Sequence, residues 1–188
     1  MRSLLLSLLA MLPFLGGCSS PSYVDQQLDP GLVTEIQALG DHNWIVIADQ
    51  SFPLHTRRGV RTLLVDKEIP EVLNGVLNVI DSQQHVSPVF YKSRELSAVR
   101  NDDAPGIDFY RQQLDAVFQA RGQADFVREL QHQSLSVILE DESKSFAVLV
   151  IKTRTALPYS AVFIELESGY WTPQKEEHLR QAIEPATA

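Results

Sequence analysis

The sequence predicts an α/β protein with one domain, in which a mostly parallel sheet is flanked by helices. Short apolar runs bounded by polar residues, which are typical of buried strands, alternate with segments whose apolar residues recur at helical spacing. The chain of 188 residues is long enough for one domain with a hydrophobic core. We find no internal repeat and no second domain.

In the first half of the chain, we expect two helices and three strands. A helix is predicted over residues 32–39, and Gly40 ends it. Pro70 suits the first turn of a second helix, whose apolar stripe runs from Ile69 to Ile80. Continuous apolar runs predict strands at residues 45–48, 61–65 and 88–91.

The second half continues the alternation. A polar loop over residues 101–106 precedes a helix predicted over 107–121. Residues 126–139 are predicted to be helical, with a break near Gln133. The strongest strand pattern lies at 146–151, another at 161–166, and a charged helix over 173–183 closes the chain.

The chain begins with the features of a secretory signal. Arg2 precedes an apolar stretch over residues 4–15, which is too short to span a bilayer comfortably. The segment Leu15-Gly16-Gly17-Cys18 resembles the bacterial lipobox, in which the cysteine is lipidated and becomes the new N-terminus. The predicted organisation is a lipoprotein signal peptide at 1–17, a polar tether at 18–31 and the α/β domain with its C-terminal helix at 32–188.

These features predict a protein of the bacterial cell envelope that is attached to a membrane through lipid. More than one acyl chain makes such an anchor stable. No aspartate follows Cys18 directly, which by resemblance to enterobacterial sorting favours the outer membrane, facing the periplasm. A signal with an incidental cysteine and an uncleaved anchor helix are the alternatives.

The composition argues against binding to nucleic acid or to anionic lipid surfaces, and it excludes an internal disulfide. Without residues 1–17 the chain keeps 171 residues, with 15 basic and 24 acidic side chains and a net charge of −9. Such an acidic domain is poorly suited to nucleic acid or anionic lipid surfaces, so we expect no nucleic-acid partner. Cys18 is the only cysteine, which excludes an internal disulfide.

The common cofactor and nucleophile motifs are absent. The sequence has no glycine-rich phosphate loop, no Gly-x-Ser-x-Gly elbow and no Cys-x-x-Cys pair. Its five histidines lack the close pairing that a metal site usually needs. We therefore expect neither a metal nor a cofactor.

Two segments, residues 39–53 (LGDHNWIVIADQSFP) and residues 150–166, have a pattern that resembles the RbsD/FucU family, the D-ribose pyranases and L-fucose mutarotases. Residues 39–53, LGDHNWIVIADQSFP, resemble the family's helix end, its Gly-His-x-Asp turn, a strand ending in Ala-Asp and a loop with proline. Residues 150–166 resemble its last two strands and the turn with Pro-Tyr between them. The resemblance covers about residues 32–168. A generic α/β sheet does not easily explain Gly40, Asp49, Pro53 and Pro158-Tyr159 in this order.

The resemblance implies a function without metal or cofactor. Family members interconvert the ring forms and anomers of sugars, as one group protonates the ring oxygen and another removes the anomeric hydroxyl proton. A histidine with a pKa near neutrality suits this chemistry, and a carboxylate can set its tautomer. In the family a neighbouring subunit completes the site, so we expect a homo-oligomer that binds a monosaccharide.

This sequence departs from the family pattern where the catalytic histidine is expected. Asp41 follows Gly40, and the histidine is displaced to His42. Ala161 stands where the family has asparagine after Pro-Tyr-x. Since a shift of one residue beside a strand turns a side chain to another face, His42 does not automatically inherit the role. Asp41 is a weak base unless it is buried.

The resemblance nevertheless implies a set of site residues. His42, Asp49 and Asp41 are the predicted catalytic residues. The predicted substrate-binding residues are His55, His132, Arg154 and Tyr159. Each also has a structural interpretation, such as a surface histidine, an aspartate that caps a turn or a tyrosine of the core.

Three functions follow from these residues. The first is a membrane-tethered protein that binds a monosaccharide and interconverts its forms. The second is a catalytically inactive envelope lipoprotein that senses sugar or acts as a scaffold. An unrelated lipoprotein that aids envelope assembly is the third, and fold alone does not choose among them.

Overall fold

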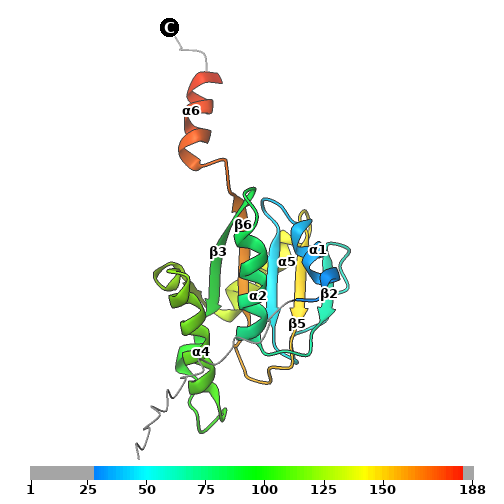
Figure 1. Ribbon diagram of the computed structural model, residues 1–188, viewed down its shortest axis with the longest axis vertical. Coiled ribbons are helices and arrows are strands. Elements are labelled where there is room, and N and C mark those ends of the chain that lie inside the picture. Colours follow the sequence, from blue (N-terminus) through cyan, green and yellow to red (C-terminus); the bar gives the residue numbers. More distant parts are fainter. Residues whose placement is uncertain (1–27, 184–188) are drawn as a thin grey trace, which may run out of the picture.

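The fold is a six-stranded sheet with helices on both faces, seen in a computed structural model that describes residues 28–183 (Figure 1). This confirms the predicted single α/β domain. The strands are β1 (Trp44–Ala48), β2 (Val60–Leu64), β3 (Val86–Ser93), β4 (Arg128–Leu130), β5 (Val148–Lys152) and β6 (Val162–Ser168). The helices are α1 (Pro30–Gln37), α2 (Ile69–Asp81), α3 (Glu95–Ala98), α4 (Ile107–Ala120), α5 (His132–Glu142) and α6 (Pro173–Ile183), with a short 3₁₀ turn at Ala124–Phe126.

The strands lie in the order β2-β5-β1-β6-β3-β4. Strand β5 runs parallel to β1 and β2, and β3 runs parallel to β4. Strand β6 is antiparallel to both of its neighbours, β1 and β3. The other five strands therefore end at one edge of the sheet, which we call the carboxyl edge, and begin at the opposite amino edge.

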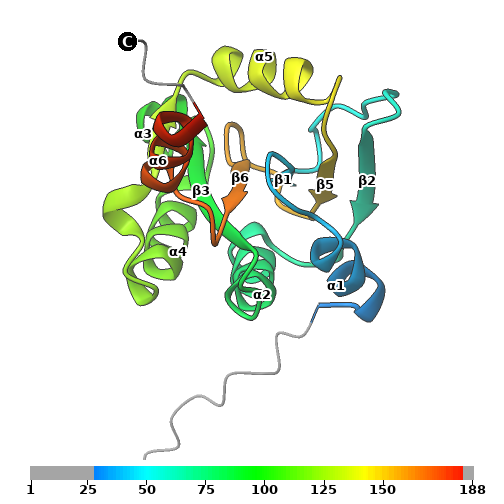
Figure 2. The same cartoon turned by 90° about the horizontal axis from the view of Figure 1, so that it is seen from above.

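The two faces of the sheet have separate cores, because successive side chains of a strand point to opposite faces. In β1, Ile45 and Ile47 pack with residues of α1, α2 and α4, whereas Trp44, Val46 and Ala48 pack with α5 on the other face. Figure 2 shows α1, α2 and α4 below the sheet and α5 alone above it. Every residue of β1 is buried, as expected for a central strand with both faces covered.

Most predicted elements are confirmed, but the segment 126–139 is not one helix. Residues Arg128–Leu130 form β4, and the helix α5 begins only at His132. The strand β4 consists of a basic residue, an acidic residue and a leucine. It therefore lacks the apolar run that marks a buried strand. Its existence depends on pairing with Tyr91–Ser93 of β3.

One strand edge is only partly covered. Strand β4 pairs with Tyr91–Ser93, so the first half of β3 is paired with β6 alone. Pro88 lies in this half and partners Leu166 of β6. A proline lacks an N–H donor and is normally confined to edge strands, which agrees with its position here.

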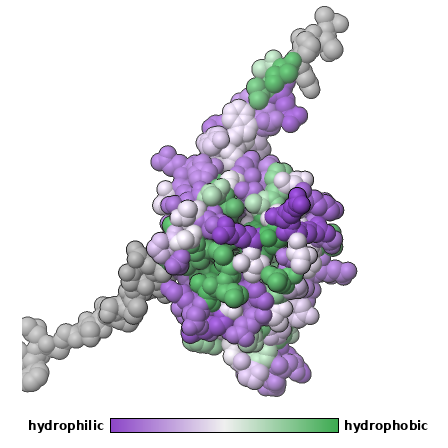
Figure 3. Space-filling model, turned by 90° about the vertical axis from the view of Figure 1, so that its right-hand side faces the viewer, coloured by the Kyte–Doolittle hydropathy of each residue, from purple (hydrophilic) through white to green (hydrophobic). Residues whose placement is uncertain are grey.

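Helix α6 projects from the body at the amino edge, as Figures 1 and 3 both show. None of its residues is buried. Among residues 28–183, no helix is both long and apolar enough to cross a membrane. The predicted signal peptide and most of the tether, including Cys18, lie outside the described residues.

Candidate functional site

Buried polar side chains gather at the carboxyl edge of the sheet. Within residues 28–183 the buried polar side chains are Asp49, Ser93, Ser143, Thr153, Thr155 and Ser160. All except Ser143 lie at the carboxyl ends of β1, β3 or β5, or just before β6. Since burial of a polar group is costly unless it is hydrogen-bonded, this concentration marks the edge as a candidate site.

Asp49 directly follows β1 and is 8% exposed. Its Oδ1 accepts hydrogen bonds from the backbone N of Ser51 at 2.8 Å and from the Ser51 hydroxyl at 2.6 Å. The carboxylate therefore caps the following turn, as a structural interpretation requires. Its Oδ2 receives no hydrogen bond from the described residues and is available to a ligand.

The loops after β1 and β5 are bound tightly to each other. The Thr153 hydroxyl and the Thr153 backbone N both donate to the carbonyl of Ala48, at 2.9 Å each. The Gln50 backbone N donates to the carbonyl of Thr155 at 2.9 Å. The parallel pairing of β1 and β5 thus continues past the strand ends and fixes Asp49 in place.

Thr155 connects this edge to the start of α2. Its hydroxyl donates to Glu68 Oε2 at 2.5 Å and accepts from the backbone N of Ile69 at 3.0 Å. The hydroxyl thereby satisfies a free amide of the first helical turn. These two hydrogen bonds explain how the polar Thr155 side chain can be buried.

Tyr110 of α4 holds the turn before β6. Its hydroxyl donates a short hydrogen bond to the carbonyl of Ser160, and the tyrosine as a whole is 4% exposed. Burial raises the pKa of Tyr110 far above its ordinary value, and the negative charges of Asp49 and Glu68 raise it further. The phenol therefore stays protonated and remains a donor at physiological pH.

Tyr159, next to Ser160, contacts His132 at the start of α5. The two rings meet edge to face with centroids 5.4 Å apart. Tyr159 has a φ of 56°, which is rare for a bulky residue, and it is 41% exposed. A strained and exposed tyrosine above a buried polar layer is the arrangement expected of a ligand contact rather than of the core.

His132 is positioned by two neighbours. Its Nδ1 lies 3.2 Å from the Ser93 hydroxyl, and its backbone N donates to both carboxylate oxygens of Glu95, at 3.0 and 3.1 Å. Glu95 thus caps α5 from another helix. With Nδ1 engaged, Nε2 is the ring nitrogen left to exchange a proton with a ligand.

His55 lies on the α5 side of the same edge. Its ring is 5.8 Å from that of Phe52, which in turn meets Phe163 of β6 at 6.4 Å. The Lys152 ammonium donates to the carbonyl of Phe52 at 2.8 Å. This ring contact places the His55 imidazole beside Phe52.

Arg154 lies at the carboxyl edge but is engaged by α2. Its guanidinium lies 2.9 Å from Glu68 and 4.0 Å from both Asp66 and Glu71. Three carboxylates therefore compete with any ligand for its charge. The structure does not bring Arg154 to His132 or Tyr159 by any direct contact.

Asp41 and His42 lie at the opposite, amino edge. The backbone N of His42 donates to the carbonyl of Leu166, and its ring is 5.1 Å from that of Phe146. Its Nε2 is 3.7 Å from Asp41, and both side chains are exposed. The five residues of β1, about 16 Å at 3.3 Å per residue, separate this pair from Asp49. Within one chain Asp49 therefore does not orient His42.

Within residues 28–183, no group of three or more His, Cys, Asp or Glu side chains is arranged to hold a metal ion. Several residues of the site were not predicted from the sequence, namely Ser93, Glu95, Tyr110, Lys152 and Ser160. Polar residues at the ends of apolar strands, such as Ser93 and Lys152, are the signal that identifies part of this set. Tyr110 offered no such signal, since it has the spacing of a core residue.

The comparisons with known proteins agree with this architecture. A family model described as the RbsD / FucU transport protein family matches residues 24–169. The chain belongs to this family. Among solved structures, RbsD from Bacillus subtilis complexed with D-ribose is 21% identical, with a TM-score of 0.50, over 77% of this chain and 95% of that chain. FucU from Bifidobacterium longum is 15% identical, with a TM-score of 0.53, over 77% and 97%. No curated protein sequence matches the chain.

These identities establish the RbsD/FucU fold, whereas the chemistry depends on this chain's own residues. The predicted residues Asp49, His55, His132 and Tyr159 reach the carboxyl edge, together with Arg154. Asp41 and His42 do not. The edge offers a carboxylate, an imidazole and a phenol, which together can accept, donate and transfer protons.

Proposed function

We propose that the chain binds a monosaccharide at the carboxyl edge and interconverts its anomers or ring forms. Membership of the RbsD/FucU family supports this, since the Bacillus subtilis RbsD structure contains D-ribose. The observation that carries the proposal is the gathering of Asp49, His132 and Tyr159 at one edge, over a layer of buried hydroxyls.

The reaction requires two proton transfers on one sugar. A base removes the proton of the anomeric hydroxyl while an acid protonates the ring oxygen, so that the ring opens to the aldehyde and closes again. His132 suits the exchange because its Nδ1 already meets the Ser93 hydroxyl, which leaves Nε2 toward the ligand. Oδ2 of Asp49 is the second group that exchanges a proton with the sugar, and the Tyr159 hydroxyl orients the sugar by hydrogen bonding.

A homo-oligomer would give His42 a role at this site. His42 and Asp41 lie at the amino edge of their own chain. In an assembly where the amino edge of one subunit faces the carboxyl edge of the next, His42 would approach the sugar bound by its neighbour. The proposal therefore includes self-association, and it assigns His42 to the neighbouring subunit's site.

The experiment is exchange NMR between the anomeric signals of ribose, fucose and other common monosaccharides. Spontaneous mutarotation sets the baseline, and the protein should exceed it clearly. Asp49→Asn should lose about 100- to 10,000-fold of the acceleration, the range for a lost acid–base group. Asp102→Asn is the matched control, because Asp102 is exposed in the loop before α4.

Binding without catalysis is the second candidate. Asp41 replaces the family's catalytic histidine, and Ala161, which is 1% exposed, replaces its asparagine. Saturable sugar binding without acceleration would select a sugar-sensing protein. Absence of both would leave an envelope scaffold.

We also propose that the mature protein begins at Cys18 and is attached to a bacterial membrane, with the outer membrane as its destination. The supporting observation is the Leu15-Gly16-Gly17-Cys18 segment after a short apolar stretch. Intact mass of the native membrane fraction should give a chain that starts at residue 18 and carries diacylglycerol. A free thiol on the mature protein would refute the lipid anchor.

A further inference from the structure

Helix α6 lies beyond the part of the chain that the family model matches. The RbsD/FucU match ends at residue 169, and α6 covers Pro173–Ile183. The helix has 11 residues, none of them buried. Isolated helices shorter than about 12–15 residues are marginal in water, so a helix of this length normally requires packing against another surface.

One side of α6 is suited to such packing. Leu179 and Ile183 are four residues apart, so they share a face, and they are 42% and 68% exposed. Lys175 and Glu176 flank this face at helical spacing. Leaving two large aliphatic side chains on one face of a projecting helix indicates a contact surface.

The start of α6 is held in a defined direction. The Trp171 indole N–H donates to Glu176 at 2.8 Å, and the Lys175 ammonium donates to the carbonyl of Tyr170 at 2.7 Å. The Trp171 backbone N donates to the Ser168 hydroxyl at the end of β6 at 3.0 Å. These local bonds tie the helix to the last strand while leaving its apolar face open.

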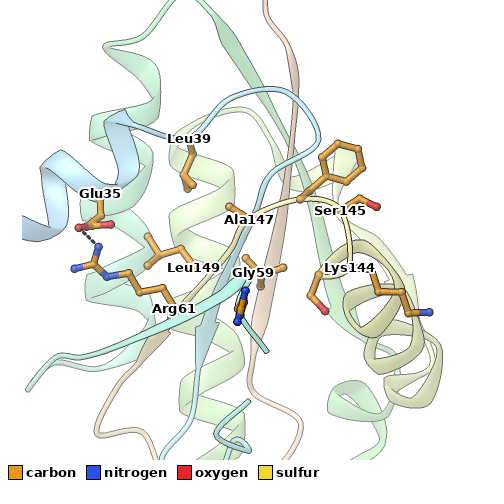
Figure 4. A pocket seen from close by; sticks show the side chains of 12 residues that line it. Glu35, Leu39, Gly59, Arg61, Lys144, Ser145, Ala147 and Leu149 are labelled. Atoms are coloured by element: carbon orange, nitrogen blue, oxygen red, sulfur yellow. Dashed lines mark ion pairs between the residues drawn. The ribbon is translucent and has the colours of Figure 1, made fainter. Parts of the chain in front are cut away.

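A pocket of about 380 Å³ lies at the same amino edge of the sheet. Leu39, Ala147 and Leu149 form its apolar floor, and an ion pair between Glu35 and Arg61 forms one wall (Figure 4). Arg58 also lines it and makes no ion pair or hydrogen bond with the described residues. The pocket thus combines apolar surface with an uncompensated positive charge.

The helix and the pocket lie on opposite halves of the sheet. The pocket is built where β2 and β5 begin, whereas α6 leaves from β6, across β1. In Figure 1, α6 stands above β3 and β6 and projects away from the body. A twofold axis perpendicular to the sheet, placed beyond the amino edge, sets the β6–β3 half of one copy opposite the β2–β5 half of another.

We propose that α6 of one chain docks in the amino-edge pocket of a second copy, and that the second copy returns the contact. Leu179 and Ile183 would cover the floor formed by Leu39, Ala147 and Leu149. Glu176 lies beside that apolar face, is paired with Arg180 of the same helix at 2.8 Å, and would also meet the guanidinium of Arg58. The result is a twofold dimer with two identical helix-in-pocket contacts. It is an alternative to the neighbour contact proposed for His42, because the His42 ring lies beside the pocket, against Phe146.

Disulfide trapping in the full chain tests this contact. In a Cys18→Ser background, the pair Leu179→Cys and Ala147→Cys should oxidise to a product of doubled mass on a non-reducing gel. Ala147 is exposed in the pocket, so the substitution does not disturb the core. The control pairs Leu179→Cys with Asp102→Cys, in the loop before α4. It should give no linkage of comparable yield.

Three results would overturn the proposal. Absence of the doubled mass would exclude the contact, and consumption of both thiols without doubled mass would show that α6 folds back on its own chain. A blue shift of Trp171 fluorescence on phospholipid vesicles, without cross-linking, would place α6 on a membrane surface instead.

Charge reversal separates a specific contact from chance collision. Arg58→Glu should reduce the cross-linked fraction several-fold, and addition of Glu176→Arg should restore it. Ile183→Glu should abolish the product while the melting temperature of the monomeric body stays unchanged, since no residue of α6 is buried. If the double charge reversal failed to restore cross-linking, the assigned register of helix in pocket would be wrong.

Discussion

The two edges of the sheet differ in how their polar groups are treated. At the carboxyl edge Asp49, Thr153 and Ser160 are buried, and each takes part in a hydrogen bond within the protein. At the amino edge Asp41 and His42 are exposed, and the His42 Nε2 lies 3.7 Å from the Asp41 carboxylate. A layer of buried, satisfied polar groups fixes geometry, which proton transfer requires, whereas an exposed edge with an open pocket is suited to association.

The largest expected effect is on the mutarotation rate, and it distinguishes His132 from His42. His132→Ala should remove at least about 100-fold of the mutarotation rate enhancement, because it deletes the imidazole at the carboxyl edge. His42→Ala should lower the rate only in the assembled oligomer, where a neighbouring subunit uses it. Exchange NMR on concentrated and diluted protein measures both. If His42→Ala were harmful in the monomer and His132→Ala harmless, the assignment of the edges would be reversed.

A second comparison uses two glycines of the amino edge. A Cβ on Gly59 would lie 2.5 Å from the carbonyl oxygen of Ser143 and 3.0 Å from that of Phe146, whereas one on Gly40 meets nothing within 4 Å. Because backbone atoms cannot move aside, Gly59→Ala should lower the free energy of unfolding by about 1–3 kcal/mol. Gly40→Ala should change it little. Urea denaturation compares the two, and equal midpoints would contradict the predicted contact.

Alkaline pH should lower the stability of the protein through two buried tyrosines, Tyr91 and Tyr110. Burial, and then the hydrogen bond and charge of Glu165, raise the pKa of Tyr91 to about 12. Burial raises the pKa of Tyr110 as well. Unfolded tyrosines release their protons near pH 10, so the free energy of unfolding should be constant below that pH and fall as pH rises toward 12.

The measurement is urea denaturation at a series of pH values from neutral to alkaline. Tyr91→Phe should make the free energy of unfolding fall less steeply at alkaline pH. The decrease in the free energy of unfolding that this variant shows at neutral pH reports the missing hydrogen bond to Glu165. A slope that is unaltered by this substitution would show that Tyr91 does not carry the pH dependence.

The smallest effect concerns the two ends of α5, one at each edge. Glu95→Gln should reduce the free energy of unfolding by about 0.3–1 kcal/mol, since it weakens the carboxylate that caps the His132 amide. Glu142→Gln, in the last turn, should cause no loss because a negative charge is unfavourable there. Hydrogen exchange in the first turn of α5 reports the capping effect. Equal losses at both ends would mean that total charge, not the cap, is responsible.

The strands and helices could be predicted because periodicity and burial carry their information locally. The strand at 45–48 and the helix at 173–183 agree with β1 and α6 to within a residue. Strand β4 could not be found, since its residues Arg128–Leu130 become a strand only by pairing with β3, far away in the sequence.

The candidate site was predictable in part for a related reason. Asp49 and Tyr159 border strands whose ends meet at one edge, so a sequence pattern locates them together. The separation of His42 from Asp49 follows from the direction of β1, which is also a local property. By contrast, the engagement of Arg154 by Glu68 depends on where α2 begins, and side-chain partners of that kind have no signature in the sequence.

Pro88 protects the sheet from uncontrolled growth. The first half of β3 lies at an edge that β4 leaves open, and an open edge can recruit a strand from another molecule. Because proline has no amide hydrogen, Pro88 cannot donate a hydrogen bond to a strand added at this edge. Replacing Pro88 with valine would restore an amide donor and give an apolar run over residues 88–91, and the protein would then be expected to aggregate through this edge during expression.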